Sequence, residues 1–169
     1  MALTYAIRDN GPADGWVFYD KGSYSNGWRY LEAAPSDASS SAWSNVSTSM
    51  VGCSNSAIGA GATNTTQIIN QSGHSTSAAK LCADLSTGGY SDWFLPSKDE
   101  LNKIWVNLKR GWDESNYYYT PVGDVANAHY WSSTEYSYSH AEKQGLWNSG
   151  VGGNFYKYMV YNVRCVRAF

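Results

Sequence analysis

The sequence predicts one α+β domain, spanning residues 1–169, with a mainly antiparallel twisted sheet, two or three helices and long ordered loops. Two observations lead to this class. Helical periodicity occurs only in the middle of the chain, whereas short segments typical of strands lie on both sides of it. At 169 residues the chain is also long enough to bury one hydrophobic core without metals or disulfides for bulk stability.

The first elements that we expect form a β-hairpin. Trp16–Asp20 and Trp28–Leu31 have the pattern of short strands, and the Gly/Ser/Asn-rich segment Gly22–Gly27 between them is typical of a turn. The segment Ser36–Ser56 is rich in serine but also contains large apolar residues, which a flexible linker would not need. We therefore expect a long ordered loop with short strands there.

Two helices of different strength are expected next. Asn64–Gln71 is a weak candidate. Ser77–Leu85 is stronger, because its apolar residues recur at helical spacing on one face, and the pair Gly88-Gly89 ends it. The residues on that face are Ala78, Leu81, Cys82 and Leu85.

The clearest local signal predicts a helix that begins at Ser97. Ser97 is a good N-cap, Glu100 stands three residues later as its capping-box partner, and Gly111 lies just past the expected end. The stripe that we expect to be buried consists of Leu101, Ile104, Trp105 and Leu108.

Strand-like segments return after this helix. We expect short strands at Tyr117–Thr120 and Tyr130–Ser133, and one final strand over Val163–Phe169. Both ends of the chain are then expected to lie in the sheet. Trp131, framed by the sequence YWSS, is expected in the core.

The composition argues against several classes of partner. The net charge is −2 and the pI is about 5.8, which disfavours binding to nucleic acid or to an anionic membrane surface. No apolar run is long enough for membrane insertion, and the first residues carry no export signal. The compartment therefore stays open at this stage.

Motifs for catalysis and metal binding are missing from the sequence. His74, His129 and His140 form no HxxxH or HExxH frame, and there is no GxSxG or CxxC motif. GAGATN at 59–64 lacks the lysine and spacing of a phosphate loop. We expect no enzymatic activity, no cofactor and no metal. The three cysteines, Cys53, Cys82 and Cys165, cannot all pair within one chain, and buried thiols are one interpretation of them.

The segment from Ser139 to Asn162 has a different character from the rest of the chain. It mixes Tyr, Asn, Gly and Ser with single charges and shows no clear period. Tyr and Trp give large contact area at low entropy cost, and Ser, Gly and Asn give adaptable hydrogen bonds, as in antibody binding loops. We expect Tyr136, Tyr138, Trp147, Tyr156 and Tyr158 to be exposed.

We expect the residues from about Tyr136 to Tyr161 to form one ligand-binding face, with His140, Glu142, Lys143, Asn154 and Lys157 making directional polar contacts. Exposed aromatic residues would also serve self-association, so a homo-oligomer is an alternative use. The ligand-binding residues that we predict are Tyr136, Tyr138, His140, Glu142, Lys143, Trp147, Asn148, Val151, Asn154, Phe155, Tyr156, Tyr158 and Tyr161.

Four parts of the chain carry a resemblance to a known family: GPADGWVFYDKGSYSNGWRYLEAAPSD, KLCADLSTGGYSDWFLPSKDELNKIW, YWSSTEYS and the closing VRCVRAF. In this order they resemble the C-terminal domain of the Legionella collagen-like adhesin, over about Gly11–Phe169. The resemblance implies a C-type lectin fold of the subclass shared with formylglycine-generating enzyme, on a cell surface or a phage particle. It also implies a disulfide between a helix and the last strand, here Cys82 with Cys165.

Some proteins of this group are variable proteins of diversity-generating retroelements, in which template adenines are mutated and the end of the gene is rewritten. An AAC codon mutated at its adenines reaches the residues at positions His140, Gly145, Val151, Asn154, Phe155, Tyr156, Tyr158 and Tyr161. It does not reach Glu142, Lys143, Trp147, Lys157 or Met159. Those five are framework, come from other codons, or mark an unvarying member.

The resemblance leaves three functions. The first is a non-enzymatic module that binds a protein or glycan receptor through a variable face. The second is an unvarying adhesin for glycosaminoglycans, which requires a basic patch from Lys143, Lys157, Arg164 and Arg167. The third, an oxidase akin to formylglycine-generating enzyme, requires two close reactive cysteines, and only Cys165 lies near the chain end.

Overall fold

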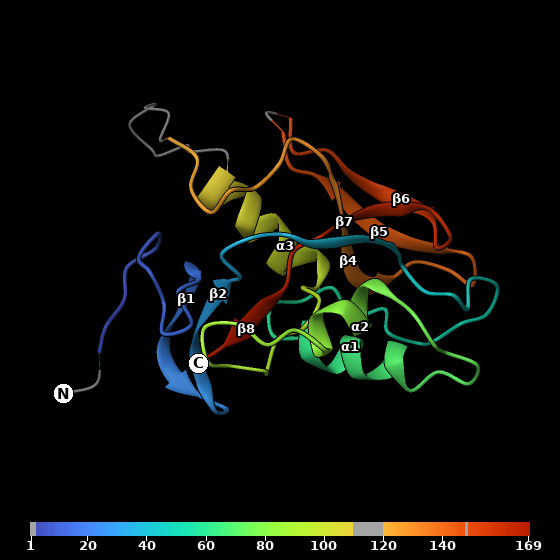
Figure 1. The fold of residues 1–169 in the computed structure, drawn as a ribbon, viewed down its shortest axis with the longest axis horizontal. Helices are drawn as coiled ribbons and strands as arrows, with labels where there is room; N and C mark the ends of the chain where they lie inside the picture. The colour runs from blue at the N-terminus through green and yellow to red at the C-terminus, as the bar shows by residue number, and fades with distance from the viewer. Residues whose placement is uncertain (1–2, 110–119, 148) are drawn as a thin grey trace.

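The computed structural model describes residues 3–109, 120–147 and 149–169, and these ranges fold into two sheets with helices beside them (Figure 1). The smaller sheet has the order β1-β2-β8, built from β1 (Trp16–Ser25), β2 (Trp28–Ala33) and β8 (Val166–Ala168). The larger has the order β3-β7-β4-β5-β6, built from β3 (Ala38–Ala42), β4 (His129–Glu135), β5 (His140–Gly145), β6 (Gly152–Tyr156) and β7 (Val160–Val163).

The fold class is α+β, as predicted. Every ladder between named strands is antiparallel except β4 with β7, which is parallel. The N-terminal segment and the C-terminus lie at the same end of the molecule, beside the smaller sheet (Figure 1). The strand β3 lies within Ser36–Ser56, where an ordered loop with short strands was expected.

The hairpin of β1 and β2 follows from its turn residues. Asn26 and Gly27 both have positive φ, at 50° and 84°, which is the conformation of a tight two-residue hairpin turn. Asparagine and glycine adopt it most readily. β1 therefore continues to Ser25, through most of the segment that was predicted to be the turn.

The helices of the described ranges are α1 (Gly61–Ile69), α2 (Ala78–Ala83), α3 (Lys98–Ile104) and a π-helical turn, η1 (Trp105–Lys109). All three predicted helices are present. α2 ends at Ala83, before the expected Gly88-Gly89, because Asp84 already forms its C-cap. Gly111 and most of the strand predicted at Tyr117–Thr120 lie outside the described residues.

The capping box at α3 forms as predicted. Ser97 Oγ accepts a hydrogen bond from the Glu100 amide (3.3 Å), and the Glu100 carboxylate accepts one from the Ser97 amide (2.7 Å). Glu100 is buried, and burial raises the pKa of its carboxyl. Leu101, Ile104 and Leu108 are buried as expected, whereas Trp105 is half-buried.

The prediction of one final strand over Val163–Phe169 is wrong. The chain passes from β7 in the larger sheet to β8 in the smaller one, and Arg164 and Cys165 lie between them. Backbone pairing changes at this point, since Val163 pairs with Ala38 and Val166 with Ala33. The break shows that this terminal segment joins the two sheets.

The core has two parts. One surrounds Trp43 and the fully buried Trp131, and it contains the disulfide between Cys82 of α2 and Cys165. The other lies between α3 and the strands of both sheets, around Phe18 and Tyr130. The disulfide agrees with the pairing that the family resemblance implied, while Cys53 is a buried free thiol whose pKa burial raises to about 12.

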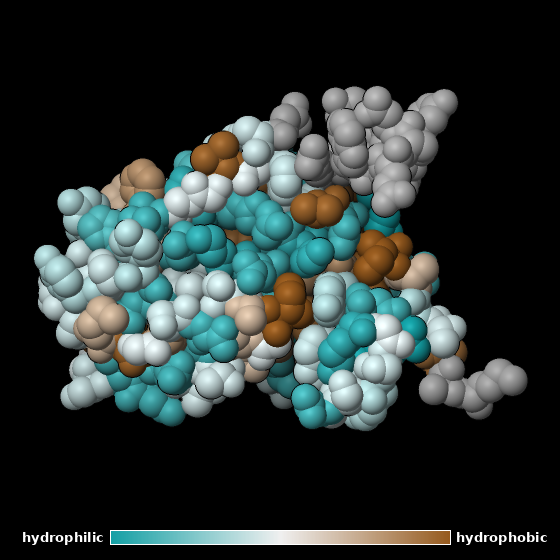
Figure 2. All heavy atoms as spheres, turned by 180° about the vertical axis from the view of Figure 1, so that it is seen from behind, coloured by the Kyte–Doolittle hydropathy of each residue, from teal (hydrophilic) through white to brown (hydrophobic). Residues whose placement is uncertain are grey.

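The surface seen from behind is mainly hydrophilic, with hydrophobic residues scattered between hydrophilic ones (Figure 2). Such scattered residues are usual for protein surfaces. None of the helices in the described ranges has the length and apolarity needed to cross a membrane.

Candidate ligand-binding face

The segment that showed no period in the sequence forms regular structure. It contains β5, β6 and most of β7; β5 and β7 each pair with β4, and β6 pairs with β5. β6 pairs with β5 in continuous register from His140–Tyr156 to Gln144–Gly152 and forms the edge of the sheet. Alternation was hidden because both faces of this hairpin carry polar and aromatic side chains.

The register divides the predicted binding residues between the two faces of the β5–β6 hairpin. Cross-strand partners lie on the same face, and successive residues of a strand lie on opposite faces. His140, paired with Tyr156, and Glu142, paired with Asn154, therefore share one face. Phe155, paired with Ala141, lies on the other face with Lys143. A single surface made by all these residues, as the sequence suggested, is not what the fold produces.

One group, which we call the open-face cluster, consists of His129, Lys143, Trp147, Phe155 and Tyr161. His129 is its centre, with ring centroids 4.5 Å from Trp147 and 5.2 Å from Tyr161. Phe155 is 43% exposed, and Tyr161 is half-buried. The cluster is a partly exposed aromatic surface beside the buried Trp131, which lies 4.8 Å from the Tyr161 ring.

Lys143 places a cation inside this cluster. Its Nζ lies 2.9 Å from His129 Nδ1 and 4.7 Å from the centroid of the Phe155 ring. Burial lowers the pKa of Lys143, and burial together with the adjacent Lys143 ammonium lowers the pKa of His129. A neutral His129 ring that accepts a hydrogen bond from the ammonium fits both shifts.

The second group, which we call the tyrosine rim, consists of Tyr136, Tyr138, His140, Tyr156 and Tyr158. The four tyrosines are exposed, as predicted. Tyr156 packs between His140 and Tyr158, with ring centroids at 4.2 and 5.2 Å. These residues come from the β4–β5 turn, the start of β5, the end of β6 and the turn that follows it.

Lys157, in the turn that follows β6, connects this turn to the β4–β5 turn from the interior of the protein. It is fully buried and its Nζ donates to Glu135 Oε1 (2.6 Å), the Ser49 carbonyl (2.9 Å) and the Tyr138 carbonyl (3.0 Å). The expectation that Lys157 contacts a ligand is therefore wrong. A lone lysine between exposed tyrosines looks like a surface residue, and only the partners supplied by distant segments make its burial favourable.

The remaining predicted residues vary in exposure. Glu142 is buried, with Oε1 3.1 Å from Lys98 Nζ of α3 and Oε2 without a hydrogen-bond partner in the described part of the chain. Asn154 is half-buried and Val151 is exposed. Trp147, expected to be exposed, is half-buried. Asn148 lies outside the described residues.

Trp147 packs where residue 145 has no side chain. A Cβ at Gly145 would lie 2.4 Å from the Trp147 ring, so only glycine leaves room for it. The Trp147 carbonyl also accepts a hydrogen bond from Trp105 Nε1 (2.8 Å). Gly145 and Trp105 thus fix the position of Trp147 within the open-face cluster.

The basic patch expected for glycosaminoglycan binding is not formed at the surface. Lys157 and Arg164 are fully buried, and Arg167 and Lys143 are 4% and 7% exposed. Arg164 is bound to Asp37, and Arg167 to Glu32 and Asp92. Three of these four cations are neutralised inside the protein by carboxylates, since Lys157 also pairs with Glu135.

Sequence reasoning missed His129, which is central to the open-face cluster. It stands directly before YWSS at the start of β4, and the register places it opposite Gly145. A prediction of β4 one residue longer at its start would have put His129 on the same face of the strand as Trp131. Within the described ranges no group of three or more His, Cys, Asp or Glu side chains is placed to hold a metal ion.

A family model described as the Lcl C-terminal domain matches residues 38–167, which is more than half of the chain. The chain belongs to this family. The Lcl C-terminal domain family fits an adhesin-like or variable binding module. No curated protein matches the chain.

Proposed function

We propose that this Lcl C-terminal domain is a non-enzymatic ligand-binding module whose exposed side chains around β5 and β6 vary between copies through a diversity-generating retroelement. The receptor is a protein or a glycan, and the module acts on a bacterial surface or a phage particle. The open-face cluster and the tyrosine rim supply the contact surfaces.

One observation carries the proposal. The residues that adenine mutagenesis of an AAC codon can produce are mostly exposed or half-buried, whereas most of those that it cannot produce are buried. The reachable residues other than Gly145 are exposed or half-buried, namely His140, Val151, Asn154, Phe155, Tyr156, Tyr158 and Tyr161. Of the unreachable residues, Glu142, Lys143 and Lys157 are buried. Trp147 is half-buried, and Met159 is 37% exposed.

The physical reason for this division is that exposed side chains can change at little cost. Substitutions at surface positions usually alter stability by less than about 0.5 kcal/mol, while removal of one partner of a buried ion pair costs about 3–5 kcal/mol. A module of this design can diversify its contacts and keep its fold.

Sequencing of the 3′ end of this gene and its flanks in many cells of one population tests the proposal. We expect a nearby template copy beside a reverse-transcriptase gene, with differences confined to template adenines. The codons of Val151, Asn154, Phe155, Tyr156 and Tyr158 should vary, and those of Glu142, Lys143 and Lys157 should not. An unvarying end without a template would contradict the variable-protein proposal.

The alternative of an unvarying adhesin for sulfated glycosaminoglycans has less support. It requires exposed cations, and the four that the sequence offered are buried. We expect the domain to pass through a heparin column at physiological salt. Retention that falls steeply as salt rises would instead favour the adhesin.

The cysteines support a non-enzymatic function. Cys165 is bonded to Cys82, and Cys53 is buried with a raised thiol pKa, so none of the three is an accessible thiolate. Oxidation of a cysteine-containing peptide by the domain, lost in Cys165→Ser, would overturn this part of the proposal.

A further inference from the structure

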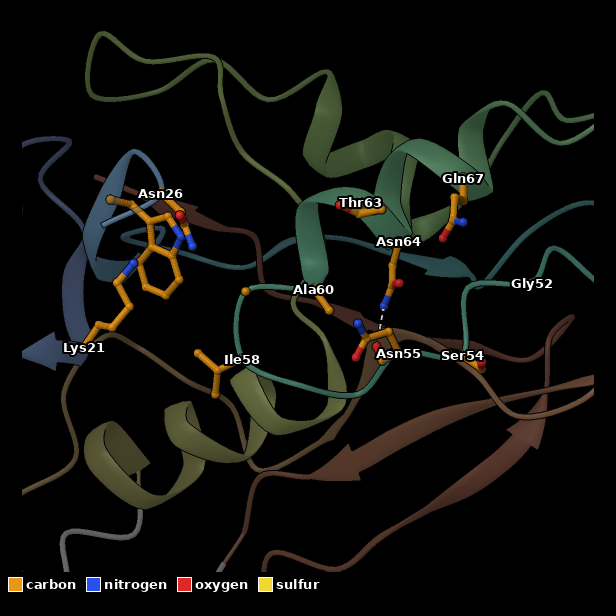
Figure 3. Close-up of a pocket in the computed structure, with 12 residues that line it drawn as sticks. Lys21, Asn26, Gly52, Ser54, Asn55, Ile58, Ala60, Thr63, Asn64 and Gln67 are labelled. Atoms are coloured by element: carbon orange, nitrogen blue, oxygen red, sulfur yellow. Dashed lines mark hydrogen bonds between the residues drawn. The ribbon is translucent and has the colours of Figure 1, made fainter. Parts of the chain in front are cut away.

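A second concave surface lies away from the open-face cluster and the tyrosine rim and shares no residue with either. It is a cleft of about 760 Å³ between the β1–β2 hairpin, the segment 52–59 and α1. Figure 3 shows Lys21 and Asn26 entering from the hairpin, and Asn64 and Gln67 projecting from α1 toward the segment that carries Ser54 and Asn55. The volume is in the range of sites for small ligands.

The helix α1 presents a polar face to this cleft. Ala60, Thr63, Asn64 and Gln67 all line it, at the i, i+3, i+4 and i+7 spacing that places side chains on one face. This is the helix that begins in GAGATN, the motif that lacks the features of a phosphate loop. The helix N-terminus is not free for an anion, because the Glu100 carboxylate accepts a hydrogen bond from the Gly59 amide (2.7 Å).

Asn64 is the sharpest feature of the cleft. The residue is 1% exposed, and its Nδ2 donates to the Asn55 carbonyl (2.7 Å) and to Ser133 Oγ (3.3 Å). A carbonyl only accepts, so the nitrogen must face Asn55 and the amide orientation is fixed. Asn64 Nδ2 makes both hydrogen bonds of this side chain within the described residues, and Oδ1 is not among the fully buried atoms that lack a partner, so it remains open to the cleft that the residue lines. An acceptor of fixed orientation in the wall of the cleft is available to a donor group of a ligand.

The charges around the cleft favour an uncharged ligand. No acidic side chain lines it within the described part of the chain. The Lys21 ammonium is already bound to the Ser25 carbonyl (2.6 Å) and lies 3.8 Å from the centroid of the Trp28 ring. The polar lining consists mainly of amides and hydroxyls, which pair equally well with donors and acceptors.

We propose that this cleft binds a neutral saccharide, whose hydroxyl groups meet Asn64 Oδ1 and the amides of Asn55 and Gln67, and whose carbon-bound hydrogens meet Trp28 and Ile58. A sugar hydroxyl supplies a donor to Asn64 Oδ1 and can accept from a neighbouring amide at the same time. The apolar side chains provide the aromatic and aliphatic wall that small-ligand sites usually have. This site is independent of the open-face cluster and the tyrosine rim.

The test is an NMR titration of the ¹⁵N-labelled domain with four separate sugars: glucose, galactose, mannose and N-acetylglucosamine. We expect at least one to cause saturable shifts of the side-chain amide signals of Asn64 and Gln67, with a dissociation constant on the order of 1 mM. No saturable shift for any of the four at concentrations up to about 100 mM overturns the proposal.

Two matched variants locate the site. Thr63→Arg should fill the cleft and weaken sugar binding by about tenfold or more, equivalent to about 1.4 kcal/mol. Thr66→Arg adds the same side chain to an exposed position of α1 that does not line the cleft, and should bind as the unchanged protein does. Equal binding by both variants overturns the assignment to this cleft, provided that both retain dispersed NMR spectra.

A third variant tests whether the saccharide binds at the tyrosine rim instead. Tyr156→Ala/Tyr158→Ala should leave sugar binding unchanged, because neither residue lines the cleft. Sugar binding lost in that variant but kept in Thr63→Arg would move the saccharide to the tyrosine rim. Binding only of a heparin disaccharide, and of none of the neutral sugars, would also contradict the proposal.

Discussion

In the last thirty-five residues, several cations are buried and several tyrosines are exposed, which reverses the usual pattern. Lys157, Arg164 and Arg167 lie at or near zero exposure, whereas Tyr136, Tyr138, Tyr156 and Tyr158 are 47–61% exposed. In most proteins lysine and arginine are at the surface. Buried ion pairs therefore stabilise the interior of this domain, while aromatic side chains lie at its surface.

The buried charges gain from partners that are far apart in the sequence. Arg164 donates to Asp37 (2.6 Å) and to the carbonyls of Ala34, Gly123 and Asp124, so its guanidinium ties the β7–β8 junction to two loops. Arg167 makes a bidentate pair with Asp92 at 2.7 and 2.9 Å and a further bond to Glu32. Desolvation of each cation is offset only by the whole set of bonds.

The exposed aromatic residues make few such bonds. Tyr156 contacts the rings of His140 and Tyr158, and Phe155 contacts those of His129 and Tyr161. An exposed aromatic side chain whose contacts are with other rings can be replaced without leaving a buried charge unpaired. We therefore expect substitution of the buried charged residues to lower the free energy of unfolding strongly, and substitution of the tyrosine-rim residues to lower it little.

The largest loss is expected for Arg164→Ala. It leaves Asp37 without its cation, although Tyr130 and Asn162 still donate to that carboxylate, and it removes the donor from three carbonyls, those of Ala34 and Gly123 in buried hydrogen bonds and that of Asp124 in a partly buried one. We expect a loss of about 5 kcal/mol in the free energy of unfolding, measured by urea denaturation. Arg164→Lys should recover only part of it, because one ammonium cannot reproduce the planar fork. Full stability in the lysine variant would show that charge alone suffices.

Removal of the disulfide should cause the next largest loss in the free energy of unfolding. In Cys82→Ala/Cys165→Ala the unfolded chain is no longer closed across a separation of 83 residues, and we expect a loss of about 4 kcal/mol by the same measurement. Cys53→Ala serves as a control for loss of a buried thiol. A double variant no less stable than this control would show that the frame does not depend on the cross-link.

Lys157→Met should cost somewhat less, about 3 kcal/mol, because the methionine side chain keeps the packing against Trp43 while Glu135 loses its cation. Glu135 retains the hydrogen bonds from the amides of Val51 and Gly52, which limits the loss. Thermal unfolding followed by circular dichroism measures it. A loss below about 0.5 kcal/mol would place Lys157 with the replaceable surface residues.

The smallest effects are expected on either side of Lys157. Tyr156→Ala and Tyr158→Ala should each change the free energy of unfolding by less than about 0.5 kcal/mol, although both positions adjoin the buried lysine. Denaturation of the three variants at 156, 157 and 158 under one set of conditions gives the comparison directly. A loss at Tyr156 equal to that at Lys157 would contradict the division between frame and rim.

Local signals explain which elements could be predicted. The capping box of Ser97 and Glu100 needs only residues three positions apart, and the α3 helix begins where it predicts. The hairpin of β1 and β2 was found for the same reason, although its strands continue beyond the predicted bounds. The β5–β6 hairpin gave no such signal, since its residues follow neither a strand nor a helix pattern of apolar side chains.

The sequence by itself determined the α+β class, the three helices and the exposure of the tyrosines, because capping, spacing and composition act over a few residues. Only the tertiary structure decided that the terminal segment divides between two sheets, that Lys157 and the arginines are interior, and that His129 centres the open-face cluster. These features depend on partners that are distant in the sequence, such as Asp37 for Arg164, which lie 127 positions apart. Burial of a charge is favourable only where such partners meet it, and no local pattern records their meeting.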